Sequence, residues 1–100
     1  MESVYEYSLV KELQLRKINV SYQVKVPLYY KGYDTLKEFF IDILVENEII
    51  IEVKAVDLLH PVHEAQLLSY LKLADKKLGF LINFNVVLIK DGFKRKVNNY

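Results

Sequence analysis

Apolar residues change their spacing along the first third of the chain, and each spacing predicts a different element. Over residues 3–18 they recur at near-helical spacing with charges between them, which predicts a helix carrying Val4, Leu9, Leu13 and Ile18. Over residues 21–30 apolar and polar side chains alternate, which predicts a strand with one wetter face. The segment Lys31-Gly32-Tyr33-Asp34 has the composition of a turn.

The middle of the chain predicts two strands and a helix. The strands cover about 37–45 and 49–56 and are separated by Glu46-Asn47-Glu48. Residues 62–76 are rich in helix-forming residues, with Pro61 just before them and Gly79 as the expected stop.

The last part of the chain predicts two more strands. Residues 78–89 are strongly apolar and β-prone, which predicts a buried strand. Asp91-Gly92 is a strong hairpin signal, so Phe93–Val97 is expected to return as an edge strand. Helix, three strands, helix, strand and hairpin return together predict an α/β sandwich with a mixed sheet, built as a meander and then a crossover helix.

Composition limits what this chain can do. One hundred residues suffice for a single domain, 1–100. The net charge of +1 excludes a strong overall attraction to nucleic acid, so phosphate contact would need a local basic patch. There is no Cys, which removes disulfides, thiolate metal sites and Cys nucleophiles and fits a cytoplasmic protein. No apolar run reaches the ~18 residues that span a membrane, and the first residues do not form a signal peptide.

The strand pair at 37–56 carries the candidate chemistry. If its loop is centred on Asn47, Asp42 lies directly opposite Glu52, five residues to either side. Period-two alternation then gives one wholly apolar face, expected to look into the core, made of Ile41, Ile43, Val45, Ile49, Ile51, Val53 and Ala55. The other face holds Phe40, Asp42, Leu44, Ile50, Glu52, Lys54 and Val56.

Two carboxylates so placed have Cβ atoms roughly 5 Å apart and repel each other, most of all where apolar neighbours exclude water. Either Lys54, two residues along the same face, or a divalent cation can offset the repulsion. Mg²⁺ prefers one or two carboxylates, waters and a substrate phosphate, and Asp42 and Glu52 fit that preference. Lys54 would then orient the attacking water or stabilise charge on the phosphoryl group. The alternative interpretation is a solvated face, because Glu-x-Lys is common in strands.

The second predicted helix adds polar side chains. Gln66 and Tyr70 are spaced i, i+4 and share one helical face. A Gln can contact a phosphate and a Tyr can pack against a base, whereas the plainer interpretation makes Tyr70 a core residue and Gln66 a surface residue. His60 and His63 flank Pro61 without a usual zinc spacing and are interpreted as helix-entry residues.

These residues together resemble a known motif. Ile41-Asp42, nine residues, then Glu52-Val53-Lys54 resembles the PD-(D/E)XK motif of restriction-endonuclease-like nucleases, and Gln66-x-x-x-Tyr70 resembles the QxxxY motif of an exonuclease branch. Over nearly its whole length the chain is similar to the small bacterial GxxExxY proteins, in the segments 2–5, 26–32, 52–56, 63–71, 79–84 and 90–95. The resemblance implies a restriction-endonuclease-like α-β-β-β-α-β core, with a mixed sheet flanked by helices and a C-terminal hairpin.

The resemblance also implies a metal-dependent phosphodiester hydrolase acting on nucleic acid, with DNA favoured over RNA. Asp42 and Glu52, with the carbonyl of Val53, would ligate Mg²⁺ or Mn²⁺, and Lys54 would be the catalytic lysine. Gln66 would act with these catalytic residues. Tyr70, and Glu2 as the helix carboxylate near the metal, would support the site.

Two departures from the family keep an alternative open. Family members usually carry a further helix and a Gly before the ExxY segment, so the N-terminal helix of this chain is expected to be truncated. They often carry a basic residue where this chain has Phe40. Both departures favour a catalytically inactive module that binds nucleic acid or protein on the same fold. A third hypothesis is a structural domain of a toxin–antitoxin, phage or mobile-element system.

The basic residues near the C-terminus are candidates for nucleic-acid binding: Lys90, Lys94, Arg95 and Lys96. Charges on an edge strand also discourage pairing with other chains, which explains the same residues without a ligand. A single active site serves only one strand of a duplex, so action on duplex DNA would call for a homodimer.

Overall fold

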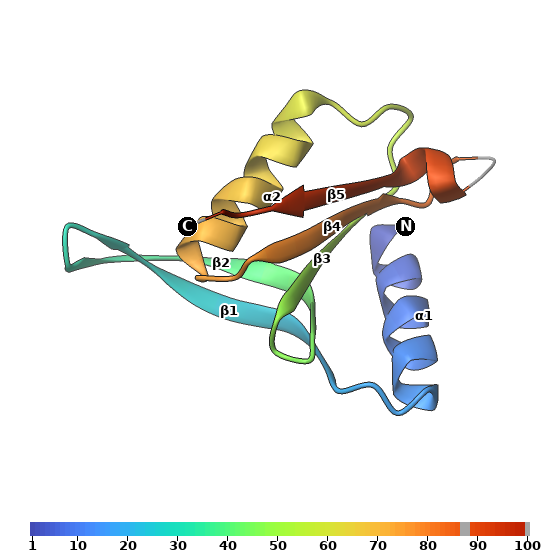
Figure 1. Cartoon of the computed structure of the whole chain (residues 1–100), viewed down its shortest axis with the longest axis horizontal. Coiled ribbons are helices and arrows are strands. Elements are labelled where there is room, and N and C mark those ends of the chain that lie inside the picture. Colours follow the sequence, from blue (N-terminus) through green and yellow to red (C-terminus); the bar gives the residue numbers. More distant parts are fainter. Residues whose placement is uncertain (87–88, 100) are drawn as a thin grey trace.

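The computed structural model describes residues 1–86 and 89–99. Its elements, in chain order (Figure 1), are α1 (Glu2–Leu15), β1 (Val20–Tyr30), β2 (Tyr33–Val45), β3 (Ile49–Lys54), α2 (Pro61–Leu73), β4 (Leu78–Asn83), a short 3-10 helix (Ile89–Gly92) and β5 (Phe93–Val97). This order confirms the predicted succession of helix, three strands, helix, strand and returning strand.

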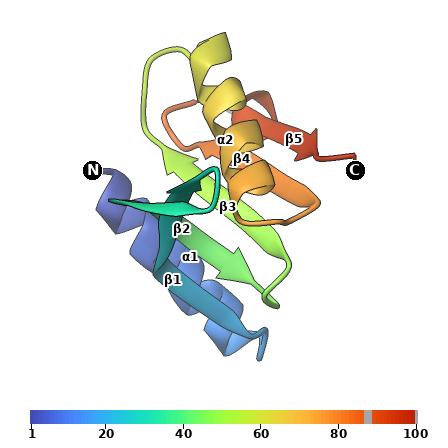
Figure 2. The ribbon, with the colours of Figure 1, turned by 90° about the vertical axis from the view of Figure 1, so that its left-hand side faces the viewer.

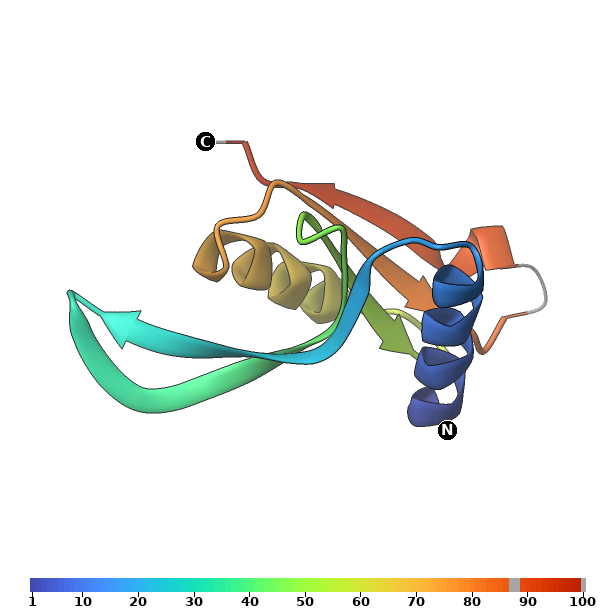
Figure 3. The ribbon, with the colours of Figure 1, turned by 90° about the horizontal axis from the view of Figure 1, so that it is seen from below.

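The five strands form one mixed sheet in the order β1-β2-β3-β4-β5. The meander β1-β2-β3 is antiparallel, α2 crosses over to bring β4 parallel to β3, and β5 returns antiparallel to β4. The two helices lie on opposite faces of the sheet (Figures 2 and 3). The predicted α/β, restriction-endonuclease-like arrangement is therefore confirmed.

Local chemistry explains where the second helix begins and ends. Pro61 occupies the first turn, where its missing N–H costs nothing, and the backbone N–H of His60 donates to Nδ1 of His63 at 3.0 Å. The two histidines are thus helix-entry residues, as predicted. The expected stop at Gly79 is wrong, because the chain leaves the helix at Asp75, whose φ is +57°. Gly79 lies in β4 instead, where an added Cβ would stand 3.0 Å from a methyl group of Leu67.

Both faces of the sheet are covered, so two hydrophobic cores form. The core beneath α2 consists of Phe39, Ile41, Leu44, Ile50, Leu67, Leu71 and Leu81. The core beneath α1 consists of Val10, Ile43, Ile51, Val53 and Ile82. The face of the β2–β3 pair that carries Asp42 and Glu52 is partly buried as well, because Leu44 and Ile50 on it lie in the core beneath α2.

The alternation of β2 changes sides at Asp42. Ile41 packs beneath α2 and Ile43 beneath α1, although period-two alternation assigns both to one face. Directly across on β1, Gln23 has a φ of +49° and interrupts the pairing between Tyr22↔Ile43 and Val24↔Ile41. Beyond this point the β1–β2 hairpin extends away from the rest of the sheet (Figure 1), and residues 29–38 are exposed.

The C-terminal part departs from the sequence prediction in two ways. β4 ends at Asn83, so the predicted strand over 78–89 is too long, and Val87 and Leu88 of that prediction lie outside the described residues. Asp91-Gly92 does not form a two-residue hairpin turn but belongs to the 3-10 helix before β5. Gly92 is needed there for a close approach, since a Cβ would collide with the backbone carbonyl oxygen of Asn83.

Candidate active site

Asp42 and Glu52 meet where β2 separates from β3. The paired residues Ile43↔Ile51, Leu44↔Ile50 and Val45↔Ile49 confirm the predicted register, which places Asp42 opposite Glu52. Beyond these pairs, Oδ2 of Asp42 accepts a hydrogen bond from the backbone N–H of Val53 at 2.9 Å. The carboxylate thus accepts a hydrogen bond that a backbone carbonyl of β2 would accept in a regular strand pair. This bond to β3 fixes the orientation of the carboxylate.

Glu52 is a buried carboxyl group without enough partners. Its residue is 6% exposed, and its Oε1 atom has no hydrogen-bond partner among the described residues. Burial first, and then the neighbouring Asp42 carboxyl, raise the pKa of Glu52 from 4.5 to about 9, while the charge of Lys54 lowers it slightly. Without a cation, Glu52 therefore carries a proton at neutral pH.

Lys54 ends β3 and is held by the strand beside it. Its side chain is half-buried, and its backbone carbonyl accepts a hydrogen bond from Phe84 N–H at 2.9 Å. The buried amide of Asn83 fixes the following segment, since its Oδ1 accepts from Val56 N–H at 3.0 Å and its Nδ2 donates to Val56 O at 2.8 Å. Sequence reasoning missed this role of Asn83, because a single Asn at the end of an apolar run carries no positional signal.

Glu2 reaches the same end of β3 from α1. Its Oε2 accepts a hydrogen bond from the backbone N–H of Ala55 at 3.3 Å, directly after Lys54. The ring of Tyr5, one turn later, stacks on Phe84 at 4.8 Å. The first turn of α1 is thereby attached to the candidate site, in the neighbourhood expected for the helix carboxylate.

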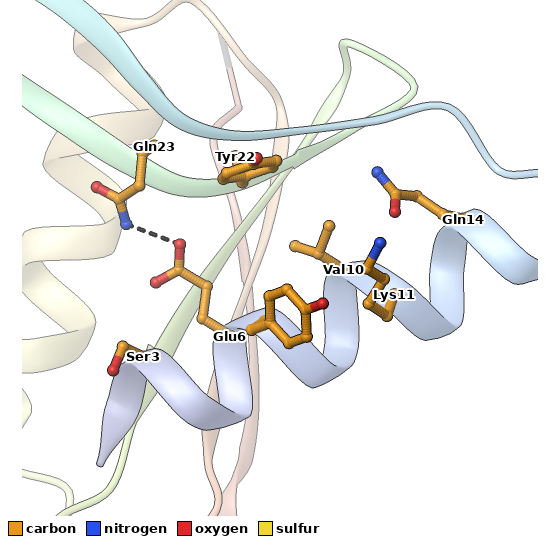
Figure 4. Close-up of a pocket in the computed structure, with 8 residues that line it drawn as sticks. Ser3, Glu6, Val10, Lys11, Gln14, Tyr22 and Gln23 are labelled. Atoms are coloured by element: carbon orange, nitrogen blue, oxygen red, sulfur yellow. Dashed lines mark hydrogen bonds between the residues drawn. The ribbon is translucent and has the colours of Figure 1, made fainter.

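A second carboxylate of α1, Glu6, also belongs to this neighbourhood, and sequence reasoning missed it. Its Oε1 accepts a hydrogen bond from Nε2 of Gln23 at 2.8 Å (Figure 4). Burial raises the pKa of Glu6, the Gln23 hydrogen bond opposes this, and the charges of Asp42 and Glu2 add to it. The link could not be read from sequence, because it depends on how α1 crosses β1.

Tyr70 lies close to the carboxylate pair and Gln66 stands further out. The Tyr70 ring stacks on Phe39 with centroids 4.3 Å apart. Burial, and then the charges of Glu52 and Asp42, raise the pKa of Tyr70. Gln66 is exposed on the same helix, and its side chain makes no hydrogen bond within the part of the chain that the structure describes.

The predicted basic residues lie on the far edge of the sheet. Lys90 is in the 3-10 helix, and Lys94 and Arg95 are exposed on β5. Lys96 forms an ion pair with Glu64 of α2 at 2.9 Å, which lowers the pKa of that carboxyl group. β4 separates this edge from β3, so these cations are not part of the Asp42–Glu52 cluster.

The carboxylate pair fits a divalent cation. Asp42 uses one oxygen for Val53, Glu52 has a buried oxygen without a partner among the described residues, and the two carboxyl groups interact with each other. Carboxylate oxygens are ligands that divalent cations prefer. Within residues 1–86 and 89–99, no group of three or more His, Asp and Glu side chains is arranged to hold a metal ion. A metal here would therefore depend on two carboxylates, the Val53 carbonyl, water and substrate.

Comparison with known proteins gives one match, to a family of nucleases. The family model described as PD-(D/E)XK nuclease superfamily matches residues 1–96. No curated protein and no solved structure matches the chain. Among the described residues, no helix is long and apolar enough to cross a membrane.

Proposed function

Because the chain belongs to the PD-(D/E)XK nuclease superfamily, we propose that it hydrolyses phosphodiester bonds of nucleic acid with a bound divalent metal ion, Mg²⁺ or Mn²⁺. Nucleases of this superfamily generally depend on such a metal. One observation carries the proposal. A buried glutamate with an unsatisfied oxygen lies beside a second carboxylate, and a lysine stands two residues along the same strand. Buried polar atoms in folded proteins nearly always have a hydrogen-bond partner, so a buried carboxylate oxygen without one is a candidate metal ligand.

Asp42, Glu52 and the carbonyl of Val53 are the proposed ligands. A divalent ion held by them supplies positive charge that favours ionisation of a bound water and neutralises charge on the phosphoryl oxygens. Two features of the chain favour binding of the ion. The hydrogen bond from Val53 N–H fixes Asp42, and the burial of Glu52 keeps competing water away.

The remaining residues position the substrate and the attacking water. The ammonium of Lys54 is suited to hold the water or to stabilise a phosphoryl oxygen as negative charge develops. Glu2 holds the backbone after Lys54 through Ala55, so it acts as a positioning residue. Tyr70 stacks on Phe39 close enough to the pair for their charges to act on it. Gln66 is exposed on the same helix, and its proposed role is to contact a phosphate.

One observation favours the second candidate function, a catalytically inactive module that binds nucleic acid. Phe40 is 47% exposed two residues before Asp42, where the GxxExxY proteins that this chain resembles often carry a basic residue, and it offers no phosphate contact. Such a module would bind nucleic acid equally well with or without metal, whereas the proposed nuclease needs metal for turnover.

The test is a cleavage assay with labelled single-stranded and duplex DNA, and with RNA, in Mn²⁺, Mg²⁺ or EDTA. We expect wild-type protein to cleave at least one substrate with metal and none in EDTA. Glu52→Gln keeps the shape of the side chain but cannot become anionic, and it should abolish cleavage. Cleavage that persists in Glu52→Gln, or an absence of cleavage on every substrate with both metals, would contradict the proposal.

A further inference from the structure

A pocket opens beside the candidate active site, between α1 and the start of β1. It has a volume of about 420 Å³, within the range of small-molecule sites, and its lining surface is mostly apolar. The lining residues are Ser3, Glu6, Tyr7, Val10, Lys11, Gln14, Tyr22 and Gln23. Those from the helix follow i, i+3/i+4 spacing, so they form one stripe of α1, on which Val10 is buried against the sheet and Tyr7 is exposed.

Two residues of the pocket, Glu6 and Gln23, connect it to Asp42. Gln23 and Glu6 bound the pocket on one side, and the hydrogen bond between them joins β1 to α1 (Figure 4). Gln23 lies opposite Asp42 at the interruption of the β1–β2 pairing. The negative charge of Asp42 also raises the pKa of Glu6. A molecule in this pocket would therefore lie one strand away from the proposed scissile phosphate.

The side chains of the pocket suit a flat aromatic ligand attached to an anion. The ring of Tyr22 lies over the helix from β1, and Val10 points toward it from α1 (Figure 4). Tyr7 of α1 lines the same pocket. Tyr22 and Tyr7 are 60% and 63% exposed, so both rings are accessible to a ligand in the pocket. The ammonium of Lys11 lies 5.6 Å from the centre of the Tyr7 ring and supplies a cation at the outer end.

We propose that this pocket binds an unpaired nucleobase next to the cleaved phosphate, so that the protein selects single-stranded nucleic acid or a frayed strand end. The inference rests on the proposed nuclease function for the position of the scissile bond. A paired base is stacked inside its duplex and cannot enter such a pocket, whereas an unpaired base can stack on Tyr22. Lys11 would contact the phosphate that follows the base.

Binding measured without cleavage tests the pocket apart from the catalytic function. The probe is a fluorescein-labelled oligothymidylate, followed by anisotropy in EDTA, with a blunt hairpin duplex for comparison. Wild type should bind the single strand more tightly than the duplex. Tyr22→Ala should weaken single-strand binding by about 5- to 150-fold, the range for loss of one base–aromatic stack. Tyr22→Phe should retain most of the affinity.

Tyr33→Ala is the matched control, because Tyr33 is 78% exposed at the far tip of the β1–β2 hairpin and lies outside the pocket. It should leave binding unchanged, and circular dichroism checks that each variant is folded. The proposal is overturned if Tyr22→Ala binds the single strand as wild type does, or if it weakens duplex binding equally. It is also overturned if wild type binds no single strand, or if Tyr22→Ala dissociates a dimer, since a second copy would then occupy the pocket.

The failure of each idea gives a different pattern. If the nuclease function is wrong but the pocket is correct, no metal produces cleavage and Tyr22→Ala still loses single-strand affinity in EDTA. If the pocket is wrong but the nuclease function is correct, Mn²⁺ produces cleavage and Tyr22→Ala cleaves and binds as wild type does.

Discussion

The Oδ2 atom of Asp42 accepts a hydrogen bond from the backbone N–H of Val53 at 2.9 Å. This contact ends the backbone ladder between β2 and β3 and fixes one proposed metal ligand against the residue that would supply another. The carboxylate is therefore oriented before any ion arrives, which lowers the entropic cost of binding. Its second oxygen takes no part in this hydrogen bond, and we propose that it is a metal ligand.

The stability of the metal-free protein should depend on the proton of Glu52. Its pKa is about 9 in the folded protein and 4.5 in the unfolded chain, so between these values the folded state binds more protons. Stability is then full below about pH 4.5 and falls as pH rises toward 9, by on the order of a few kcal/mol. Urea unfolding in EDTA at several pH values measures this fall.

Glu52→Gln is the control for that pH dependence. The amide cannot ionise, so the variant should be more stable than wild type at pH 8 in EDTA and should lose the fall between pH 4.5 and 9. The same downward slope in both proteins would show that another group is responsible.

Replacing Lys54 should separate binding from turnover. Lys54→Ala removes the ammonium proposed to stabilise developing charge, and we expect kcat to fall by about 10²- to 10³-fold or more. Metal affinity should change little, because Lys54 is not a ligand. Single-turnover cleavage and Mn²⁺ calorimetry on the same samples check both statements, with Lys72→Ala on the exposed side of α2 as the control. A large loss of metal binding would place Lys54 in a structural role.

Asn83 should matter for stability and for the position of Lys54. Asn83→Ala leaves both backbone groups of Val56 without their partner in a site that is 2% exposed, so we expect a loss of about 1–3 kcal/mol. Asn99, which is exposed, is the matched position, and Asn99→Ala should change stability by less than about 0.5 kcal/mol. Thermal unfolding measures the stability of the two variants. Equal stability would contradict the stabilising role of Asn83.

The sequence was sufficient for the register that brings the two carboxylates together. The loop Glu46-Asn47-Glu48 lies between two strands, and Glu46 and Asn47 adopt positive φ angles of 53° and 56°. A loop centred there leaves one pairing that keeps the apolar residues together, and the structure has that pairing. The turn residues and the alternation of apolar side chains favour the same register, so the prediction succeeded.

The sequence failed where distant segments decide. Alternation alone predicts one buried face, but α1 and α2 cover both, and the interruption at Gln23 turns Ile41 toward α2. The role of Glu6 depends on the crossing of α1 over β1, and the role of Asn83 depends on its hydrogen bonds to the backbone of Val56, which is distant in the sequence. None of these contacts leaves a periodic signal in the chain.

Calorimetric titration of Mn²⁺ into wild type, Asp42→Ala and Asp42→Asn tests the central claim most directly. Asp42→Asn keeps an acceptor for Val53 N–H and loses the charge, so it separates ligand loss from unfolding. We predict binding to wild type that tightens as pH rises toward 9, because Glu52 must release its proton, and loss of binding in both variants. The account is contradicted if wild type binds no Mn²⁺, even with a short oligonucleotide present, or if both variants bind as wild type does.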